Sequence, residues 1–465
     1  MKTDTLTTLR DGLRGTEFEG RLYLVGGYVR DKLLGRRVGD APLEDIDLVL
    51  EGDAMAVARL LWRLRIADHS PVEFPNFGTA MVHVGGAQVE LVTARAETYR
   101  QGSRKPVVTP GTLETDALRR DFTVNTFLEN LHTGEVRDPT GRGRADLAAK
   151  LLRTPLDPDT TFTDDPLRML RACRFAAKLG FAIEERTYAA LAKNAFRLTP
   201  EYGISFERIR DELIKTLTAP GAARGLEQMR ETGLLVKFAP ELAALYGVTQ
   251  NRFHLYDVWK HTLVALDNLP PEADAGVRLA VLLHDVGKPR TRSADPATGD
   301  VHFYEHEKVG AAITREVMNR LRFSADEIDR VTTLVALHMR YGSYDPRSWT
   351  DAAVRRLIRA VGPHRRDLFA IARADVAACN TADFPTADLD GLSARMEAIE
   401  AETHVTEATS PLSGQEIMAL LGVKPGPIIG RVKDALTDLV VAGELAPDDK
   451  PGAEAIARRI AAGHE

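Results

Sequence analysis

The pattern of hydrophobic and polar positions changes near residue 150. Before that point, short apolar runs that alternate every second residue, as strands do, are interspersed with stretches of helical periodicity. Beyond it, Ala, Leu, Arg and Glu recur with the 3.6-residue period of amphipathic helices as far as the end of the sequence. The pattern predicts an α+β protein with a mixed head followed by an all-helical body.

Local signals define the elements of the head. Glycine, proline and serine separate runs whose periodicity identifies strands and helices. The predicted elements are a strand, Gly-Gly turn and helix over 21–35, a strand over 43–53, a helix over 54–66, a hairpin over 77–95 that turns at Gly85-Gly86, and a loop over 100–112.

The helical body divides further by composition. One stretch contains most of the histidines, and the last contains a Pro-Gly-Pro break between two helices. A chain of 465 residues is too long for one ordinary core, so several domains are expected. We predict a head over 1–150, a helical neck and body over 151–245, a histidine-rich helical domain over 246–380, and a helical tail over 381–465.

Composition narrows the class of protein. No apolar run approaches the roughly 18 to 20 residues of a membrane span, and the first twenty residues lack the apolar core of a secretory signal. The two cysteines, Cys173 and Cys379, lie in Ala-rich helical surroundings and are interpreted as core thiols. We therefore expect a cytoplasmic protein without a membrane segment. The net charge of −6 argues against a positively coated surface but leaves room for a local basic groove.

Two like charges share one face of the predicted strand over 43–53. Asp45 and Asp47 are two residues apart, so they point the same way and repel each other. Paired carboxylates of this kind suit Mg²⁺, and two such ions activate a hydroxyl and steady a leaving pyrophosphate. Glu90, on a neighbouring strand, is the candidate third carboxylate. The alternative is that one aspartate caps a turn and the other is solvated.

Other polar groups in the first half suit a nucleotide. Gly26-Gly27 lies between a strand and a helix, where backbone N–H groups can approach a phosphate. A charged triplet occupies 119–121, and three arginines lie on one helix face with Asp165 one turn before them. A carboxylate beside a guanidinium imitates the hydrogen-bonding edge of a base. The three arginines are Arg168, Arg171 and Arg174.

These motifs carry a family resemblance. The stretches "LVGGYVRDKLLGR", "EDIDLVLEG", "RRDFTVNTF" and "DDPLRMLRACRFAAKLGF" resemble the class II tRNA nucleotidyltransferases, the CCA-adding family with its bacterial poly(A) polymerase relatives, over about residues 20–245. The resemblance implies a polymerase-β-like head, a helical neck, and transfer of CMP or AMP from CTP or ATP to a tRNA 3′ end, with Mg²⁺. The acceptor stem would be recognised by shape and backbone.

The resemblance also implies roles for individual residues. Asp45 and Asp47 would bind the metals, and Asp165 and Arg168 would select the base. The triphosphate and ribose would be held by Gly26, Gly27, Arg30, Arg119, Arg120, Asp121 and Asn125, with Arg171 and Arg174 also at the nucleotide. Two positions depart from the family pattern: Asp164-Asp165 replaces the common Glu-Asp, and Asn125-Thr126 replaces Asn-Ala.

The nucleotides added are a separate question. In the family, CC-only enzymes have a shortened loop between the Glu90 strand and "RRDFT", and the stretch over 94–118 is not truncated. We therefore expect an enzyme able to add the terminal A, by full CCA addition or, as a competitor, A-only addition. CC-only addition and poly(A) synthesis remain alternatives, although the poly(A) polymerases usually carry longer basic extensions than the ending "RRIAAGHE".

Polar ligand types recur along the apolar helices of 246–380. Imidazole with carboxylate suits Mn, Fe, Ni, Co or Zn better than Mg²⁺ alone. The candidate ligands are His261, His284, Asp285, His306, His338 and Asp375. The set resembles the HD superfamily of metal-dependent phosphohydrolases, in which Lys288 would face a phosphate. Fused HD domains act on phosphomonoesters and 2′,3′-cyclic phosphates at RNA ends.

Two alternatives stay open for this second site: an HD domain kept only as a scaffold, and an HD phosphohydrolase joined to an inactive head. His83, His254 and His302 are assigned no role. The expected HD metal is Mn, Ni, Co or Fe, or else Mg²⁺, and no obligate protein partner is inferred.

Overall fold

The structure is a computed structural model that describes residues 5–36, 45–98, 107–251, 254–342, 344–379, 388–402 and 409–462. It divides into two compact units, 1–240 and 241–465, which are described separately. The predicted α+β class is confirmed, because a mixed sheet in the first unit is followed by helices.

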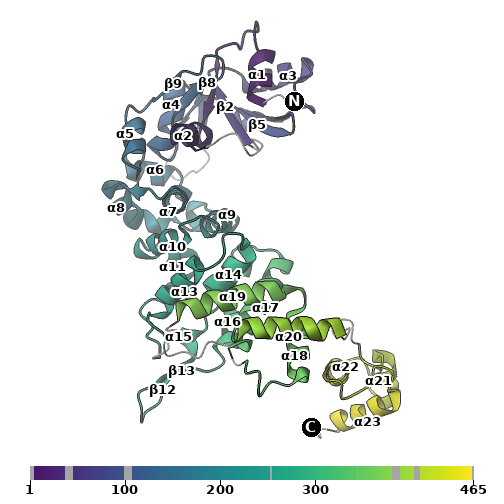
Figure 1. Cartoon of the computed structure of the whole chain (residues 1–465). Helices are drawn as coiled ribbons and strands as arrows, with labels where there is room; N and C mark the ends of the chain where they lie inside the picture. Colours follow the sequence, from purple (N-terminus) through teal and green to yellow (C-terminus); the bar gives the residue numbers. More distant parts are fainter. Residues whose placement is uncertain are drawn as a thin grey trace. The chain divides into compact units, whose positions relative to one another are not determined.

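A seven-stranded sheet is the centre of the first unit (Figure 1). Its strand order is β3-β4-β5-β2-β1-β8-β9, and all neighbours are antiparallel except β2 and β5. The strands are β1 (Leu22–Val25), β2 (Asp45–Leu50), β3 (Val72–Phe74), β4 (Thr79–Val84), β5 (Ala87–Thr93), β8 (Leu128–Asn130) and β9 (Val136–Arg137).

Alternating burial places the polar side chains of these strands on one face of the sheet. In β2, Ile46 and Leu48 are fully buried, whereas Asp47 between them is exposed. In β5, Val89 and Leu91 are buried and Glu90 is exposed. The helices and short ribbon around this sheet are α1 (Thr5–Gly12), α2 (Gly27–Leu33), α3 (Ala54–Arg63), α4 (Leu113–Leu118), α5 (Gly143–Ala148), β6 (Arg95–Thr98) and β7 (Val107–Pro110), with 3-10 turns η1 (Pro75–Phe77) and η2 (Thr123–Asn125).

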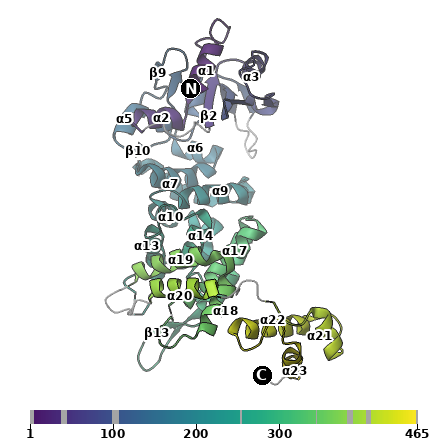
Figure 2. The same ribbon diagram turned by 45° about the vertical axis from the view of Figure 1, so that its right-hand side comes forward.

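A helical stack continues the first unit beyond the sheet. Helix α7 packs against both α9 and α10 (Figures 1 and 2). The elements are α6 (Pro158–Asp164), α7 (Leu167–Leu179), α8 (Glu185–Asn194), α9 (Phe206–Leu217), α10 (Ala222–Glu231) and α11 (Leu235–Phe238), with β10 (Leu151–Leu152), β11 (Ala182–Ile183), η3 (Ala195–Arg197) and η4 (Pro200–Tyr202).

The second unit is almost entirely helical. Its helices are α13 (Val258–Asp267), α14 (Ala275–Leu283), α15 (Lys288–Thr291), α16 (His306–Arg320), α17 (Ala325–Leu337), α18 (Asp351–Val361), α19 (Arg365–Ala378), α20 (Leu389–Glu402), α21 (Gly414–Leu421), α22 (Pro427–Ala442) and α23 (Lys450–Ala461), and α12 (Pro240–Ala243) lies where the unit begins. It also contains β12 (Arg292–Ala294), β13 (Val301–Phe303), η5 (His338–Arg340) and η6 (Gly362–His364). Helices α21 to α23 share a small apolar core, and α22 packs on α18 (Figure 2).

Three short strand pairs correct the predicted elements. Val107–Pro110 is a strand paired with β6 rather than part of a loop, and β10–β11 and β12–β13 lie in the region expected to be wholly helical. Strands of two to four residues are too short to show a period. The loop of the β12–β13 hairpin is closed by Asp295, whose carboxylate accepts from the Ala297 and Thr298 N–H groups. Residues 100–106 of the predicted loop lie outside the described part.

Candidate active sites

The Gly-Gly turn is positioned by β1 and α2. Gly26 has φ 72°, a left-handed conformation that a residue with a side chain rarely adopts. A Cβ built there would lie 3.5 Å from Asp47 Oδ2 and 3.9 Å from Arg120 Nη1. The turn therefore brings an unobstructed stretch of backbone up to the acidic strand and to the basic triplet.

A cavity of about 430 Å³ opens at this turn. It is lined by eight cationic and three anionic side chains, so it is basic although the whole chain is acidic. Such a pocket suits a polyphosphate. The lining residues are Gly26, Gly27, Arg30, Asp47, Arg119, Arg120, Asp121, Asn125, Asp165, Leu167, Arg168, Arg171, Arg174, Phe175, Lys178 and Arg208.

Most of the residues predicted for the nucleotide site therefore meet in one cavity. Of the predicted carboxylates whose side chains are described, Asp47 lines the cavity and Glu90 is not among its lining residues. Glu90 lies directly opposite Asp47 in the parallel register of β2 and β5, so the two are strand neighbours about 4.8 Å apart. Asp45 begins β2 opposite Gln88, and its side chain lies outside the described part.

A buried polar chain runs through one wall of the cavity. Arg30, which is 2% exposed, donates from Nη1 to Asn125 Oδ1 at 2.7 Å, and Asn125 Nδ2 donates to Asp121 Oδ1 at 3.0 Å. Arg171 Nη2 donates to the other Asp121 oxygen at 2.6 Å. Although burial opposes ionisation, Arg171 and Asn125 lower the pKa of Asp121 to about 2. Asp121 is therefore ionised at neutral pH and links the sheet side to α7.

The arginine pair of the triplet is held by a buried acid. Asp116, in α4, accepts from Arg119 Nε at 3.0 Å through Oδ1 and from Arg120 Nη2 at 3.0 Å through Oδ2. The two guanidinium groups are thereby fixed side by side at the cavity while their charge is only partly neutralised. We did not single out Asp116 in the sequence, although its spacing of three and four residues from the arginines is a helical signal.

The predicted base-selecting pair is arranged differently from the expectation. Asp165 Oδ2 accepts from Arg208 Nη2 at 3.0 Å, and its Oδ1 accepts from Leu167 N at 3.2 Å where α7 begins. Arg168 instead donates to the backbone oxygen of Arg119 at 2.6 Å. Both side chains line the cavity, but their polar atoms are engaged with other protein groups. Arg208, on α9, was not among the sequence candidates.

The last arginine of the predicted basic face is largely internal. Arg174 is 8% exposed, donates from Nε to Glu212 Oε2 at 2.6 Å, and lies over the Phe175 ring at 4.2 Å. Its charge is therefore directed toward α9 as well as the cavity. Lys178 lies one turn further along α7, and burial lowers its pKa.

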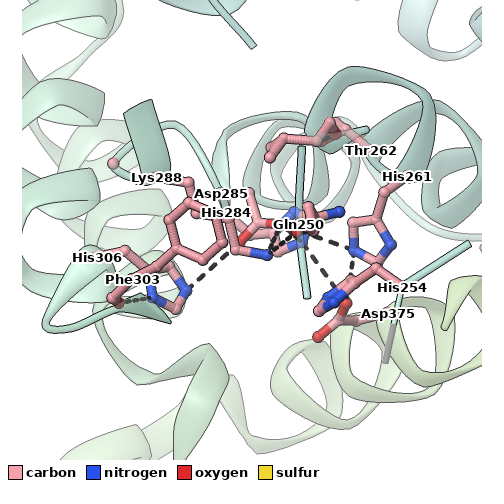
Figure 3. A network of polar contacts seen from close by, with 12 residues as sticks. Gln250, His254, His261, Thr262, His284, Asp285, Lys288, Phe303, His306 and Asp375 are labelled. Carbon is pink, nitrogen blue, oxygen red and sulfur yellow. Dashed lines mark hydrogen bonds and ion pairs between the residues drawn. The ribbon is translucent and has the colours of Figure 1, made fainter. Parts of the chain in front are cut away.

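A second cluster of titratable side chains is buried in the second unit (Figure 3). His261 lies in the first turn of α13, His284 and Asp285 follow α14, and His306 begins α16. His338 follows α17, and Asp375 lies in α19. Five helices thus deliver six ligand-type groups to one place, and every one of the sequence candidates is included.

The ligand atoms form two groups in which each atom lies within 4.8 Å of the others. One comprises His261, His284 and Asp375, and the other comprises Asp285, His306 and His338. Asp285 lies between them, because its Oδ2 is 3.2 Å from His284 Nε2 and its Oδ1 is 3.4 Å from His306 Nε2. A carboxylate placed in this way can serve two ions.

Backbone carbonyls set the tautomer of three of the rings. The Nδ1–H groups of His284, His306 and His338 each donate to the carbonyl oxygen three residues earlier, at 2.7 to 2.9 Å. Their Nε2 atoms consequently face the centre, which is the arrangement of metal-ligating histidines. His284 Nε2 is buried without a hydrogen-bond partner, although it is near the carboxylates.

The charges of the cluster favour a cation at its centre. Burial opposes ionisation of His284, but the carboxylates of Asp285 and Asp375 raise its pKa to about 10. Burial and the neighbouring His284 lower the pKa of His338 to about 3. Lys288 Nζ lies 2.7 Å from Asp285 Oδ2 and donates to Gln250 Oε1 at 2.6 Å. Tyr341 donates to Asp375 Oδ2 at 2.9 Å.

Comparisons with known proteins agree with both clusters. A family model described as the poly A polymerase head domain matches residues 22–153, one described as a probable RNA and SrmB-binding site of polymerase A matches 180–246, and an HD domain model matches 253–375. The A-adding tRNA nucleotidyltransferase of Deinococcus radiodurans is 36% identical over 438 residues, which cover 91% of this chain and 92% of that protein. The chain belongs to the tRNA nucleotidyltransferase family.

Other relatives of this tRNA nucleotidyltransferase differ in the nucleotides that their names specify. The CC-adding enzyme of Thermus thermophilus is also 36% identical, over 90% of each chain. The solved structure of the Bacillus stearothermophilus CCA-adding enzyme in complex with CTP has a TM-score of 0.67 over 99% of this chain and 98% of that chain. At 23% identity, that likeness shows the fold alone.

Several expectations outside the two sites can now be compared with the structure. Cys173 is buried as expected, whereas Cys379 is only partly buried, and burial raises the pKa of both thiols to about 12. His254, which we assigned no role, lies beside His261 with ring centroids 5.1 Å apart. Within the described residues, no helix combines the length and apolar character needed to cross a membrane.

Proposed function

We propose that this tRNA nucleotidyltransferase transfers CMP and AMP from CTP and ATP to the 3′ end of tRNA. The observation that carries the proposal is the basic cavity in which the Gly26-Gly27 turn, Asp47 and the Arg119-Arg120 pair meet. Arginines in that position can neutralise a triphosphate, and Asp121 is held ionised as part of the rigid wall. Poly(A) synthesis and an inactive head are further functions that the sequence left open, and the experiments below distinguish them.

The carboxylates suit divalent cations. Asp47 and Glu90 are register partners on neighbouring strands, and their oxygens are the hard donors that Mg²⁺ prefers. We propose that these two residues and Asp45 hold Mg²⁺, which when bound would supply charge stabilisation for the attacking 3′-hydroxyl and the departing pyrophosphate. The chain's own contribution is to bind and orient: the turn and the arginine pair fix the triphosphate.

Base selection is proposed to involve Asp165 and Arg168, with Arg208 as a third participant. In the structure Asp165 is paired with Arg208, so a base that accepted hydrogen bonds from Arg168 and donated to Asp165 would compete with protein partners already present. A wrong base that displaced these contacts without replacing them would leave Asp165 and Arg168 unpaired. Arg171 and Arg174 would position this wall through Asp121 and Glu212.

Full CCA addition is our preferred activity, and A-only addition is the competing one. The equal identities to an A-adding and a CC-adding relative leave the number of nucleotides to be measured. The decisive experiment is extension of tRNAs that end before the first C, the second C and the A, with each triphosphate supplied alone and the products resolved by single nucleotides. Long A tails without C addition would favour a poly(A) polymerase.

We further propose that the second cluster is a metal-dependent phosphohydrolase acting on phosphomonoesters or 2′,3′-cyclic phosphates. Three observations support this proposal: the two ligand groups, the Asp285 carboxylate between them, and the buried His284 Nε2 atom, which lacks a hydrogen-bond partner. A transition metal such as Mn, Ni, Co or Fe suits the imidazoles, and Mg²⁺ is the alternative. Lys288 is placed to meet a phosphate oxygen. Chelation should remove hydrolysis of a 2′,3′-cyclic nucleotide, and one of these ions should restore it.

The four-part division at residues 150, 245 and 380 is proposed as the functional organisation: nucleotidyl transfer, RNA binding and base selection, phosphohydrolysis, and a helical tail. We also propose a cytoplasmic location, which is consistent with a tRNA substrate. Limited proteolysis, with the fragments identified by mass, tests the boundaries.

A further inference from the structure

A third group of ligand-type side chains lies at one corner of the HD cluster. One atom each of His254, His261 and Cys379 lies within 4.8 Å of the others. His254 precedes α13, His261 is in the first turn of that helix, and Cys379 caps the end of α19. Only His261 is shared with the phosphohydrolase ligands, so His254 and Cys379 form a separate pair of donors that the mechanism above does not use.

The two rings have ligand positions that protein hydrogen bonds do not consume. His254 Nδ1 lies 2.9 Å from Asn251 Oδ1, and because an amide oxygen only accepts, this contact places the proton on Nδ1 and the lone pair on Nε2. His261 Nε2 lies 2.9 Å from Asp375 Oδ1, whereas its buried Nδ1 has no hydrogen-bond partner among the described residues. A fully buried ring nitrogen without a partner is costly unless something binds it.

We propose that His254, His261 and Cys379 form a further metal site, selective for zinc or another thiophilic divalent ion. Two imidazoles and a thiolate are the donor set that zinc uses in proteins, and the sulfur excludes Mg²⁺ and disfavours Mn²⁺. Binding requires the thiol to release its proton to solvent as the metal–sulfur bond forms, so the step involves no redox change. Asn251 is a positioning residue that keeps the His254 ring in the metal-ready tautomer.

The sharing of His261 couples this site to the phosphohydrolase. An ion held with His254 and Cys379 draws on a ring that the HD centre also needs, so zinc lowers phosphohydrolase activity. Nucleotide addition uses other residues and is unaffected. The inhibitory consequence rests on the proposed phosphohydrolase function, but the metal site itself does not.

Cobalt substitution tests the site directly. Co²⁺ bound to a thiolate gives a ligand-to-metal charge-transfer absorption in the near ultraviolet, which imidazoles and carboxylates do not give. The full-length protein titrated with Co²⁺ should show this band, and Cys379→Ser should lose it. The only other cysteine, Cys173, is fully buried in the first unit. A band that persists in Cys379→Ser, or its absence from the unaltered chain, would overturn the proposal.

Two further variants separate this site from the HD centre. His284→Ala removes a ligand found only in the HD set, so it should lose phosphohydrolase activity but keep the cobalt–thiolate band. Asn251→Ala should weaken cobalt binding at the thiolate site by about 10- to 100-fold, as is usual when a group that orients a ligand is removed. An unchanged affinity in Asn251→Ala would remove the tautomer argument. Zinc should inhibit 2′,3′-cyclic phosphate hydrolysis by the unaltered chain and not by Cys379→Ser, and equal inhibition of both would refute the regulatory coupling.

Discussion

Asp121 offers a quantitative test of the cavity wall. Its pKa is about 2 rather than 3.8, because Arg171 and Asn125 outweigh the cost of burial. At about 1.4 kcal/mol for each pKa unit, the ionised carboxylate contributes on the order of 2 kcal/mol to the stability of the first unit. Asp121→Asn should remove that contribution at pH 7 while keeping the shape of the side chain.

Hydrogen exchange measured by mass spectrometry is a suitable assay, because it follows each segment separately and does not require the two units to unfold together. Peptides from 113–131 and 167–179 should exchange roughly 30-fold faster in Asp121→Asn, as a loss of about 2 kcal/mol implies. Asp159→Asn is the matched control. Its carboxylate pairs with Lys193 on an exposed surface, where removing an ion pair costs about 1 kcal/mol or less, and the amide oxygen of Asp159→Asn can still accept from Asn194 Nδ2.

The pH dependence follows from the direction of the shift. A depressed carboxyl pKa stabilises the fold above the unfolded value near 3.8, and this contribution is lost as the pH falls toward 2. The difference in stability between Asp121→Asn and the unaltered chain, measured from their exchange rates, should therefore be constant between pH 5 and 7. It should begin to shrink below about pH 4. Equal exchange rates for Asp121→Asn and Asp159→Asn at pH 7 would refute the account of this wall.

Four further changes test the sites. Asp47→Asn should abolish nucleotide addition in the tRNA extension assay yet spare cyclic phosphate hydrolysis; surviving addition would contradict the metal assignment. His284→Ala should do the reverse, and equal loss of both activities would indicate misfolding. Arg168→Ala should reduce discrimination against GTP and UTP by about 1 to 3 kcal/mol, as for other base-edge contacts, and an unchanged selectivity ratio would exclude it from base choice. Gly26→Ala should cost about 1 to 2 kcal/mol in backbone strain and raise the KM for the triphosphate, whereas Gly35→Ala, with a similar positive φ but open surroundings, should leave that KM unchanged.

Strong local signals made much of the first unit predictable from sequence. The apolar runs of β2 and β5 and the turn at Gly85-Gly86 correspond to the observed strands and hairpin, and the structure puts Glu90, expected on a neighbouring strand and opposite Val89 and Leu91, in register with Asp47. The short pairs β10–β11 and β12–β13 could not be predicted, because two or three residues show no period. The HD ligands could be listed from their types, since His284, Asp285, His306 and His338 lie at the ends of helices and His261 and Asp375 lie within helices.

Long-range partners were beyond the sequence argument. Arg208 pairs with Asp165 from 43 residues away, and nothing local to either residue indicates that contact. For the same reason the sequence did not indicate that Asp165 contacts Arg208 and that Arg168 contacts the Arg119 carbonyl, and the role of the pair in base selection stays a prediction. From the sequence, His254 could not be distinguished from a surface histidine, because the metal site proposed for it also requires Cys379 at the end of another helix.

The carbonyl contacts of His284, His306 and His338 have a consequence for metal choice. Each ring is already rotated and protonated for coordination by the polypeptide itself, through the carbonyl three residues earlier. At the proposed metal centre an arriving ion would not have to rotate these rings, although it would displace the Nε2 proton of His284, whose pKa is raised to about 10. At the proposed centre, the abundance and exchange rate of each ion in the cell would then decide which first-row metal is bound, and growth conditions would change the chemistry of this enzyme without any change in its gene.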